Sequence, residues 1–147
     1  MTKAAAERIR KALEAESAAW ARRHLAADVV GWLTTVAADG RVQSSPVSFL
    51  WDGEKVLFYS KPDAPKIRNI AANPQVSFHL NTDKYGDHVL VFEGTAELDA
   101  AAPPWSANPA MEAKFHEPLE HWELEEAETS RDYSVAIRIR PARVRAW

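Results

Sequence analysis

The chain of 147 residues contains no cysteine, and this absence removes several classes of site. Without thiols there is no disulfide framework, no thiolate metal site and no cysteine nucleophile. The sequence also lacks an apolar stretch long enough to cross a membrane, and its first residues lack the apolar core of a signal peptide. We therefore expect a cytoplasmic protein with no membrane partner.

The sequence also lacks a large excess of either positive or negative charge. The formal net charge of −3 argues against a general nucleic-acid binder. The charge is uneven, with a net of +3 over residues 1–24, −6 over residues 111–128 and +4 over residues 131–147. Blocks of opposite sign could pair within one chain or across a dimer, or they could be solvated helix faces and a sheet edge.

The residues that are present predict one mainly β domain with α insertions, spanning residues 1–147. The alanine-rich residues 1–24 predict an N-terminal helix. Apolar runs, two of them followed by Asp-Gly turns, predict strands over residues 29–36, 42–51, 55–60, 75–80 and 88–98. Residues 99–131, which contain four prolines, predict a helical insertion, and residues 132–147 predict the final strand, interrupted at Pro141.

Successive hairpins with short helical inserts are typical of an antiparallel sheet closed into a barrel. Pro46 lies inside the second strand, where a residue without an N–H cannot complete a two-sided ladder. The sequence therefore predicts an edge or a bulge at Pro46, with backbone groups left free for a ligand, although a plain edge strand would fit equally well.

The most informative segment runs from Phe58 to Pro74. An apolar strand ends at Ser60 and Lys61, and a short helix follows with Lys66 in its first turn. Helix N-termini favour anions, so Ser60, Lys61 and Lys66 predict a phosphate site, with Asp63 as the N-cap. The alternative is an ordinary surface helix with solvated charges.

Other chemistry finds little support in the sequence. His116 and His121 are five residues apart, which is not the spacing of a helical metal pair, so we expect no metal site. The serines near Pro46 lack the setting of a nucleophile. His88 begins a strand and could contact a ligand. No residue can be assigned as a catalytic acid or base.

Three pieces of the sequence together resemble the flavin-binding split-barrel family of pyridoxamine 5′-phosphate oxidase. They are Leu33-Thr34-Thr35 with Asp39-Gly40, then Ser45-Pro46-Val47, then the run from Tyr59 to Pro74. The resemblance covers residues 29–98, which would hold the barrel and the cofactor site, and the last strand. It implies a six-stranded antiparallel split barrel and a homodimer that binds flavin at its interface.

Two departures from the oxidase pattern concern charge. Tyr59 and Ser60 match the Tyr-Thr pair of the oxidases, and Lys66 matches their helix lysine, but Ser44 and Phe49 stand where they have Arg and Lys. The Lys66-Ile67-Arg68-Asn69 segment is similar to the Lys-x-x-Asn helix of small actinobacterial relatives. Those actinobacterial relatives resemble reductases that use the deazaflavin coenzyme F420.

The resemblance implies hydride transfer from reduced F420 to a small organic acceptor. Lys61, Lys66 and Ser60 would hold the phosphodiester, the backbone from Ser45 to Val47 would line the ring, and Asn69 would reach the cofactor tail. Ser44, Pro46 and Tyr59 complete the expected cofactor-binding set. Two alternatives stay open: an FMN-dependent oxidoreductase or flavin reductase of the same fold, and a non-catalytic binder of flavin, deazaflavin or heme.

Overall fold

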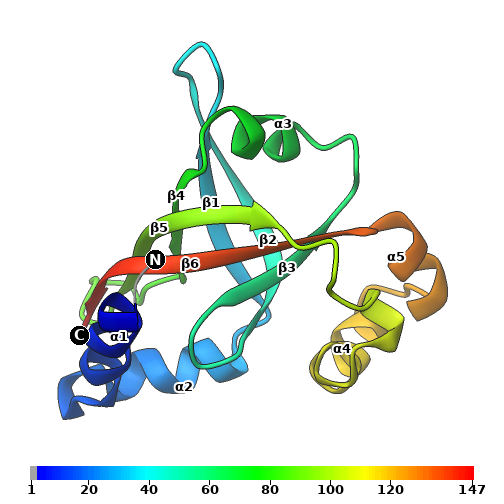
Figure 1. Cartoon of the computed structure of the whole chain (residues 1–147). Helices are drawn as coiled ribbons and strands as arrows, with labels where there is room; N and C mark the ends of the chain where they lie inside the picture. The colour runs from blue at the N-terminus through cyan, green and yellow to red at the C-terminus, as the bar shows by residue number, and fades with distance from the viewer. Residues whose placement is uncertain (1–2) are drawn as a thin grey trace.

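The computed structural model describes residues 3–147 and shows a closed six-stranded barrel (Figure 1). Neighbouring strands follow the order β1-β2-β3-β6-β5-β4, and every pair is antiparallel. The strands are β1 (Val30–Val36), β2 (Val42–Trp51), β3 (Val56–Ser60), β4 (Gln75–His79), β5 (Leu90–Leu98) and β6 (Val135–Ala146). The predicted antiparallel barrel is confirmed.

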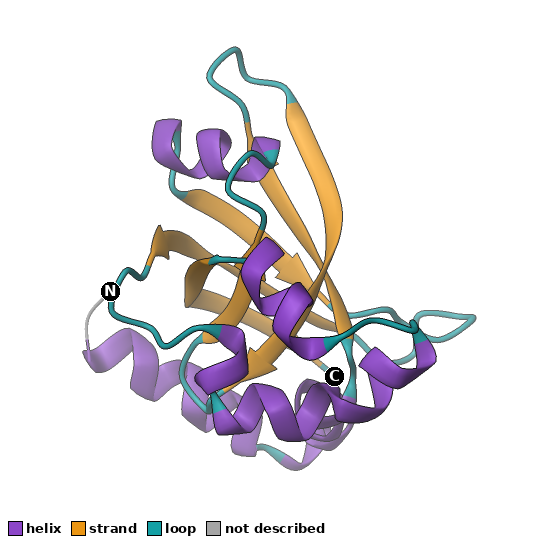
Figure 2. Ribbon diagram, turned by 90° about the vertical axis from the view of Figure 1, so that its right-hand side faces the viewer, coloured by secondary structure: helices purple, strands orange, loops and turns teal. Residues whose placement is uncertain are grey.

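The helices lie around the barrel in three groups (Figures 1 and 2). In Figure 1, α1 and α2 lie below the strands near both chain ends, α3 lies above them, and α4 and α5 lie to one side. The helical elements are α1 (Lys3–Glu14), η1 (Glu16–Ala18), α2 (Ala19–Ala27), α3 (Pro65–Ala72), η2 (Trp105–Ala107), α4 (Pro109–His121) and α5 (Glu126–Asp132). Within residues 3–147 no helix has the length and apolar character that a membrane crossing requires.

Two hydrophobic clusters meet at β3. The barrel interior is filled by fully buried side chains that include Phe49, Phe58, Phe78 and Phe92. A second cluster, which includes Tyr59, lies between β3 and the helical segment of η2 and α4. All five residues of β3 are buried. β3 is therefore an interior strand with apolar neighbours on both faces, which explains why its sequence is continuously apolar rather than alternating.

The region predicted as one N-terminal helix, residues 1–24, is helical from Lys3 but is divided into α1 and α2, and residues 1–2 lie outside the described residues. Ala15 is extended (ψ 145°) and ends the first helix, and α2 runs on to Ala27. The Arg22 guanidinium donates to the backbone carbonyls of Leu13 and Ala15 at this break, and the Ala15 carbonyl also accepts from the Ala18 N–H (3.0 Å). Trp20 of α2 packs against the core cluster and stacks on His24 and His88.

The last strand differs from the prediction at its start and at Pro141. It begins at Val135 rather than at residue 132, and it continues through Pro141 to Ala146. Pro141 is opposite Gly94, where the register of β5 and β6 shifts in a bulge. A Cβ atom on Gly94 would lie 2.0 Å from the Arg140 carbonyl oxygen. The missing side chain at Gly94 lets the two backbones approach closely and carries the ladder past the proline.

Candidate functional site

The barrel opens between β2 and β3. Their pairing ends at Phe49 and Phe58, although both strands continue beyond these residues. From Val42 to Ser48, β2 pairs with β1 alone, and Pro46 lies opposite Trp32 in a regular register. The predicted edge position of Pro46 is confirmed.

Backbone polar groups of β2 face this opening. The Phe49 N–H donates to the Val29 carbonyl on the β1 side (3.3 Å). Because successive backbone groups of a strand alternate between its two edges, the Ser48 N–H and the Pro46 carbonyl face away from β1. They have no strand partner there within residues 3–147. This edge can therefore offer backbone donors and acceptors to a ligand, and Pro46 contributes only an acceptor.

A cavity of about 270 Å³, here called the first cavity, lies at the opening. The barrel contributes Pro46, Val47, Ser48 and Tyr59 to its wall, and α3 contributes Lys66. Four residues of the predicted cofactor-binding set (Pro46, Val47, Tyr59 and Lys66) thus come together around one space. Their contact with a cofactor stays a prediction.

Lys66 lies in the first turn of α3, and among residues 3–147 it is the one charged side chain in the wall of the first cavity. It is half-buried, and burial lowers the pKa of its amine. No carboxylate within residues 3–147 forms an ion pair with it. An amine that is partly removed from water without a partner favours an anionic ligand, since an anion would restore the lost stabilisation of its charge.

The predicted N-cap Asp63 is wrong. Ala64 is the N-cap residue, and no side chain accepts a hydrogen bond there. Ala64 is extended (ψ 140°) because the ring of the next residue, Pro65, disfavours a helical conformation before it. The helix therefore begins at Pro65, and no carboxylate competes with an anion at its first turn.

Tyr59 is a fixed wall of the first cavity. It is 6% exposed, its hydroxyl donates to the Pro103 carbonyl (2.7 Å), and the same hydroxyl accepts from the Asn108 amide (3.3 Å). Its ring lies 5.9 Å from that of Trp105. Tyr59, the last residue but one of the interior strand β3, thus holds the segment after β5 against the barrel.

Two other predicted phosphate ligands lie outside the wall of the first cavity. Ser60 is buried, and its hydroxyl donates to the Lys61 carbonyl (2.9 Å), so it is not presented to a ligand in this structure. The exposed Lys61 amine lies 5.6 Å from the centre of the Tyr133 ring, a residue of the wall. Lys61 therefore lies close to the first cavity without lining it.

Ser44, Ser45 and Asn69 also lie outside that wall. The Ser44 hydroxyl is 2.7 Å from that of Thr34, and Ser45 is opposite Leu33 in the β1–β2 ladder. The Asn69 amide is buried and donates to the Thr35 hydroxyl and to the Gln43 side chain, both at 3.0 Å. Its contacts tie α3 to β1 and β2, which fixes the direction in which Lys66 points. A role in reaching the cofactor tail stays a prediction.

The aromatic side of the first cavity was missed by the sequence analysis. Trp105, Trp122 and Tyr133 line it, together with Leu119 and Leu124. All five come from the segment between β5 and β6, whose sequence predicted helices but gave no periodic pattern that could show which face meets the barrel.

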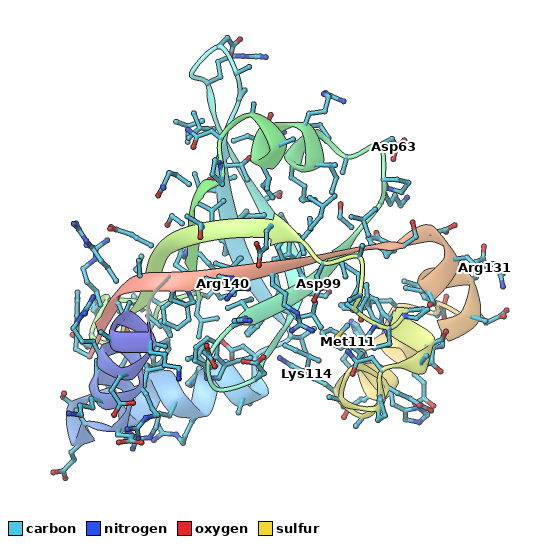
Figure 3. All side chains as sticks on the ribbon, in the orientation of Figure 1. Asp63, Asp99, Met111, Lys114, Arg131 and Arg140 are labelled. Atoms are coloured by element: carbon cyan, nitrogen blue, oxygen red, sulfur yellow. The ribbon has the colours of Figure 1, made fainter. Side chains whose placement is uncertain are left out.

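A second missed residue is Lys114 of α4, labelled in Figure 3. Its amine donates to the Phe49 carbonyl (2.7 Å) and lies 4.0 Å from the centre of the Phe49 ring. Burial lowers the pKa of Lys114 to about 8, and the charge of Asp28 opposes this change. Because β1 begins at Val30, the Phe49 carbonyl has no strand partner, and Lys114 supplies one.

The charged side chains of the three blocks and His88 do not line the first cavity. His88 precedes β5 and stacks on Trp20 at 5.5 Å. The arginines of β6 pair mainly with the neighbouring strand, as Arg140 does with Glu97 (2.7 Å). Within residues 3–147 no ion pair joins the acidic segment 111–128 to either basic block.

Solved structures with a similar fold include proteins whose names refer to F420, FAD and heme. An F420 reductase is 26% identical, with a TM-score of 0.62, over 84% of this chain and 94% of that chain. A FAD-binding protein from Mesorhizobium loti is 22% identical, with a TM-score of 0.59, over 87% of this chain and 91% of that chain. HutZ, the heme storage protein from Vibrio cholerae, is 19% identical, with a TM-score of 0.62, over 88% of this chain and 94% of that chain. The last two similarities, at 22% and 19% identity, support only the assignment of the fold.

The sequence itself matches one family over nearly its whole length. Residues 7–147 match the family described as pyridoxamine 5′-phosphate oxidase, and this range includes all six strands and the wall of the first cavity. The order of strands, the opening beside Pro46 and the lysine at the start of α3 agree with the resemblance seen in the sequence. The chain belongs to the pyridoxamine 5′-phosphate oxidase family of split-barrel proteins.

Proposed function

We propose that the protein is an F420-dependent oxidoreductase that transfers a hydride from the reduced deazaflavin to a small organic acceptor. The observation that carries the proposal is Lys66, a half-buried amine without a counter-ion in the wall of the first cavity. Similarity to an F420 reductase at 26% identity favours this cofactor over others of the family.

The charges around the first cavity fit one phosphodiester. β2 contains no charged residue, so Lys66 meets the cofactor without help from that strand. Ser44 and Phe49 occupy the positions at which the resembling oxidases carry cations, and Phe49 is fully buried in the core. An FMN site of the oxidase type would need a charged side chain where this chain has a core ring, which argues against FMN.

The remaining wall suits a planar ring. The Ser48 N–H and the Pro46 carbonyl provide hydrogen-bonding groups at one edge, and Tyr59 and Trp105 provide a fixed apolar surface. The bound deazaflavin supplies the hydride. The residues of this chain would bind the ring, orient it and exclude water. No side chain is assigned as a proton donor.

We also propose that the protein acts as a homodimer with the cofactor at the interface. The first cavity, at about 270 Å³, is slightly smaller than the range of about 300–1,000 Å³ that is usual for ligand pockets. Three residues of its wall are partly exposed to solvent: Trp122 at 38%, Leu124 at 49% and Tyr133 at 36%. A second copy of the chain would cover these side chains and enlarge the site.

Fluorescence titration of the purified protein with F420 and, separately, with FMN tests the cofactor. We expect tight binding of F420 and weak binding of FMN. Lys66→Met should weaken F420 binding by about 10- to 100-fold, the value of one charge-assisted hydrogen bond of about 1.5–3 kcal/mol. Lys84→Met, a matched change in the exposed loop before β5, should leave binding unchanged.

Each other outcome of that titration has a clear meaning. Tighter binding of FMN than of F420 would overturn the cofactor proposal, and binding of heme instead of either would do the same. Tight F420 binding without turnover of any acceptor would indicate a carrier. Equal binding by Lys66→Met and the wild type would show that the phosphate lies elsewhere.

Sedimentation velocity tests the dimer. Leu124→Glu places a charge on the partly exposed rim of the first cavity, and we expect it to produce monomers that bind F420 more weakly. Tyr85→Glu, at a 78% exposed position in a loop, is the matched control. A wild-type protein that sediments as a monomer in the presence of F420 would contradict the proposal.

A further inference from the structure

A second cavity, of about 660 Å³, lies on the other side of Tyr59. The two cavities share this residue, and elsewhere some adjacent residues of the chain line different cavities. Trp105 and Tyr133 line the first cavity, while Ser106 and Ser134 line the second. A wall made of η2, α5 and Tyr59 therefore separates them. The Ser106 and Ser130 hydroxyls, 3.1 Å apart, help to hold η2 against α5.

Small side chains leave the second cavity open. Its wall includes Ala100, Ala102, Ala127 and Ala136, and two prolines, Pro103 and Pro104, that limit backbone movement. No large aromatic side chain other than Tyr59 lines it within residues 3–147. The volume lies within the range of about 300–1,000 Å³ that small-molecule sites occupy, and a mostly apolar wall with a few polar groups is typical of such sites.

Two charged residues line the second cavity, and only one of them lacks a partner. The Asp99 carboxylate accepts from the Arg138 guanidinium at 2.6 Å, and this hydrogen bond lowers the pKa of Asp99. Arg131 of α5 forms no ion pair within residues 3–147. The acidic residues of α5 do not line the cavity. Figure 3 labels Asp99 and Arg131.

We infer that the second cavity is a binding site for a small, largely apolar organic anion, with its acid group on Arg131. The apolar wall favours burial of a hydrocarbon or aromatic body. An exposed guanidinium in the wall that has no ion-pair partner favours a carboxylate, sulfonate or phosphate on that body. The site does not contain Lys66, so the inference goes beyond the proposed function and does not depend on it.

The shared wall gives the second cavity a physical link to the first. A ligand that moved Tyr59 would have to break its hydrogen bond to the Pro103 carbonyl, which belongs to the wall of the second cavity. Binding in either cavity therefore meets a common surface that is held by Tyr59, Pro103 and Asn108.

Two fluorescent probes test the inference on the cofactor-free protein. 8-Anilinonaphthalene-1-sulfonate is apolar and anionic, and N-phenyl-1-naphthylamine has the same body without the acid group. We expect the sulfonate to bind the wild type more tightly than the neutral probe. Arg131→Gln should weaken sulfonate binding by about five- to tenfold and leave the neutral probe unchanged. Arg68→Gln, on the exposed face of α3 and outside both cavities, is the matched control.

Filling the second cavity with a large side chain provides an independent test of the inference. Ala127→Trp, at an exposed position of α5, should abolish binding of both probes, and Ala100→Trp should do so from the segment after β5 if the first variant does not fold. Ala113→Trp on α4 is the control for a new surface tryptophan. Lys66→Met should leave probe binding unchanged, which separates this site from the first cavity.

Three results would overturn the inference. The first is sulfonate binding that neither Arg131→Gln nor the tryptophan variants change. The second is probe binding that Lys66→Met abolishes, because the probe would then occupy the first cavity. The third is a change of oligomeric state in Ala127→Trp, measured by sedimentation velocity, which would mean that another copy of the chain fills the space.

Discussion

Replacing Gly31 by alanine should destabilise the barrel through one identifiable clash. Gly31 lies on β1 and is buried, and a Cβ atom there would lie 2.3 Å from Cζ and 2.5 Å from Cε2 of Phe78. The Phe78 ring cannot easily give way, because its centre is 5.1 Å from that of Phe49 and 6.4 Å from that of Phe92. The backbone of β1 would have to move instead.

The size of this effect follows from the overlap. Ordinary contact needs about 3.4 Å, so either the ring or the strand must shift by about 1 Å in a close-packed core. Overpacking of this kind costs about 1–3 kcal/mol, and the surrounding rings place Gly31→Ala near the upper end. For a domain of 147 residues, about 3 kcal/mol corresponds to a fall in Tm of about 10 °C.

Urea denaturation of a double-mutant cycle provides the assay. Phe78→Leu alone should destabilise by leaving a cavity, but Gly31→Ala combined with Phe78→Leu should cost at least about 1 kcal/mol less than the sum of the single changes. Gly53→Ala, at a turn with φ +96° and open space around it, should lose stability through backbone strain that Phe78→Leu does not relieve. Additive effects of Gly31→Ala and Phe78→Leu would refute the clash as the cause.

Three further predictions concern other contacts. Burial lowers the pKa of Lys114 from 10.5 to about 8, so the folded protein binds fewer protons than the unfolded chain between these pH values. The free energy of unfolding should therefore rise with pH in this range. The rise is at most about 3 kcal/mol, and less because solvent partly reaches the amine. Lys114→Met should remove this rise in urea titrations between pH 7 and 10.5, and parallel curves would contradict it. Gly94→Ala should lower the free energy of unfolding by at least about 3 kcal/mol in the same assay, because the backbone carbonyl of Arg140 blocks the new Cβ atom. A loss of stability smaller than that caused by Gly31→Ala would contradict this reason. Asn69→Leu should cost about 2 kcal/mol and speed amide exchange in α3, whereas unchanged exchange would show that its two hydrogen bonds do not hold the helix.

The barrel could be predicted because its signals are local. Alternating apolar residues such as Val76, Phe78 and Leu80 indicate which face of a strand is buried, and all three are buried. The Asp-Gly pairs mark the two hairpins of β1, β2 and β3. The edge position of Pro46 followed from its missing N–H alone, so it needed no knowledge of the neighbouring strands.

The candidate site could be predicted only in part, because half of its wall depends on tertiary packing. Lys66 could be found because strand, hydroxyl, lysine and helix follow one another in the chain, whereas Tyr59 was found through the match of Tyr59 and Ser60 to the Tyr-Thr pair of the oxidases. Trp105 and Trp122 could not, since nothing local shows which side of η2 and α4 packs on β3. Asp63 was a misleading N-cap signal, because the conformational effect of Pro65 on Ala64 outweighed the capping preference of an aspartate.

The one-sided stretch of β2 also bears on how the protein avoids aggregation. An unpaired strand edge is a template onto which a strand of another chain can add. Here the exposed edge is short, running from Val42 to Ser48, and the nitrogen of Pro46 faces outward in its middle without a hydrogen to donate. A foreign strand would lose a ladder bond at that point. Pro46 thus leaves the edge open to a small molecule while making it a poor partner for another β-strand.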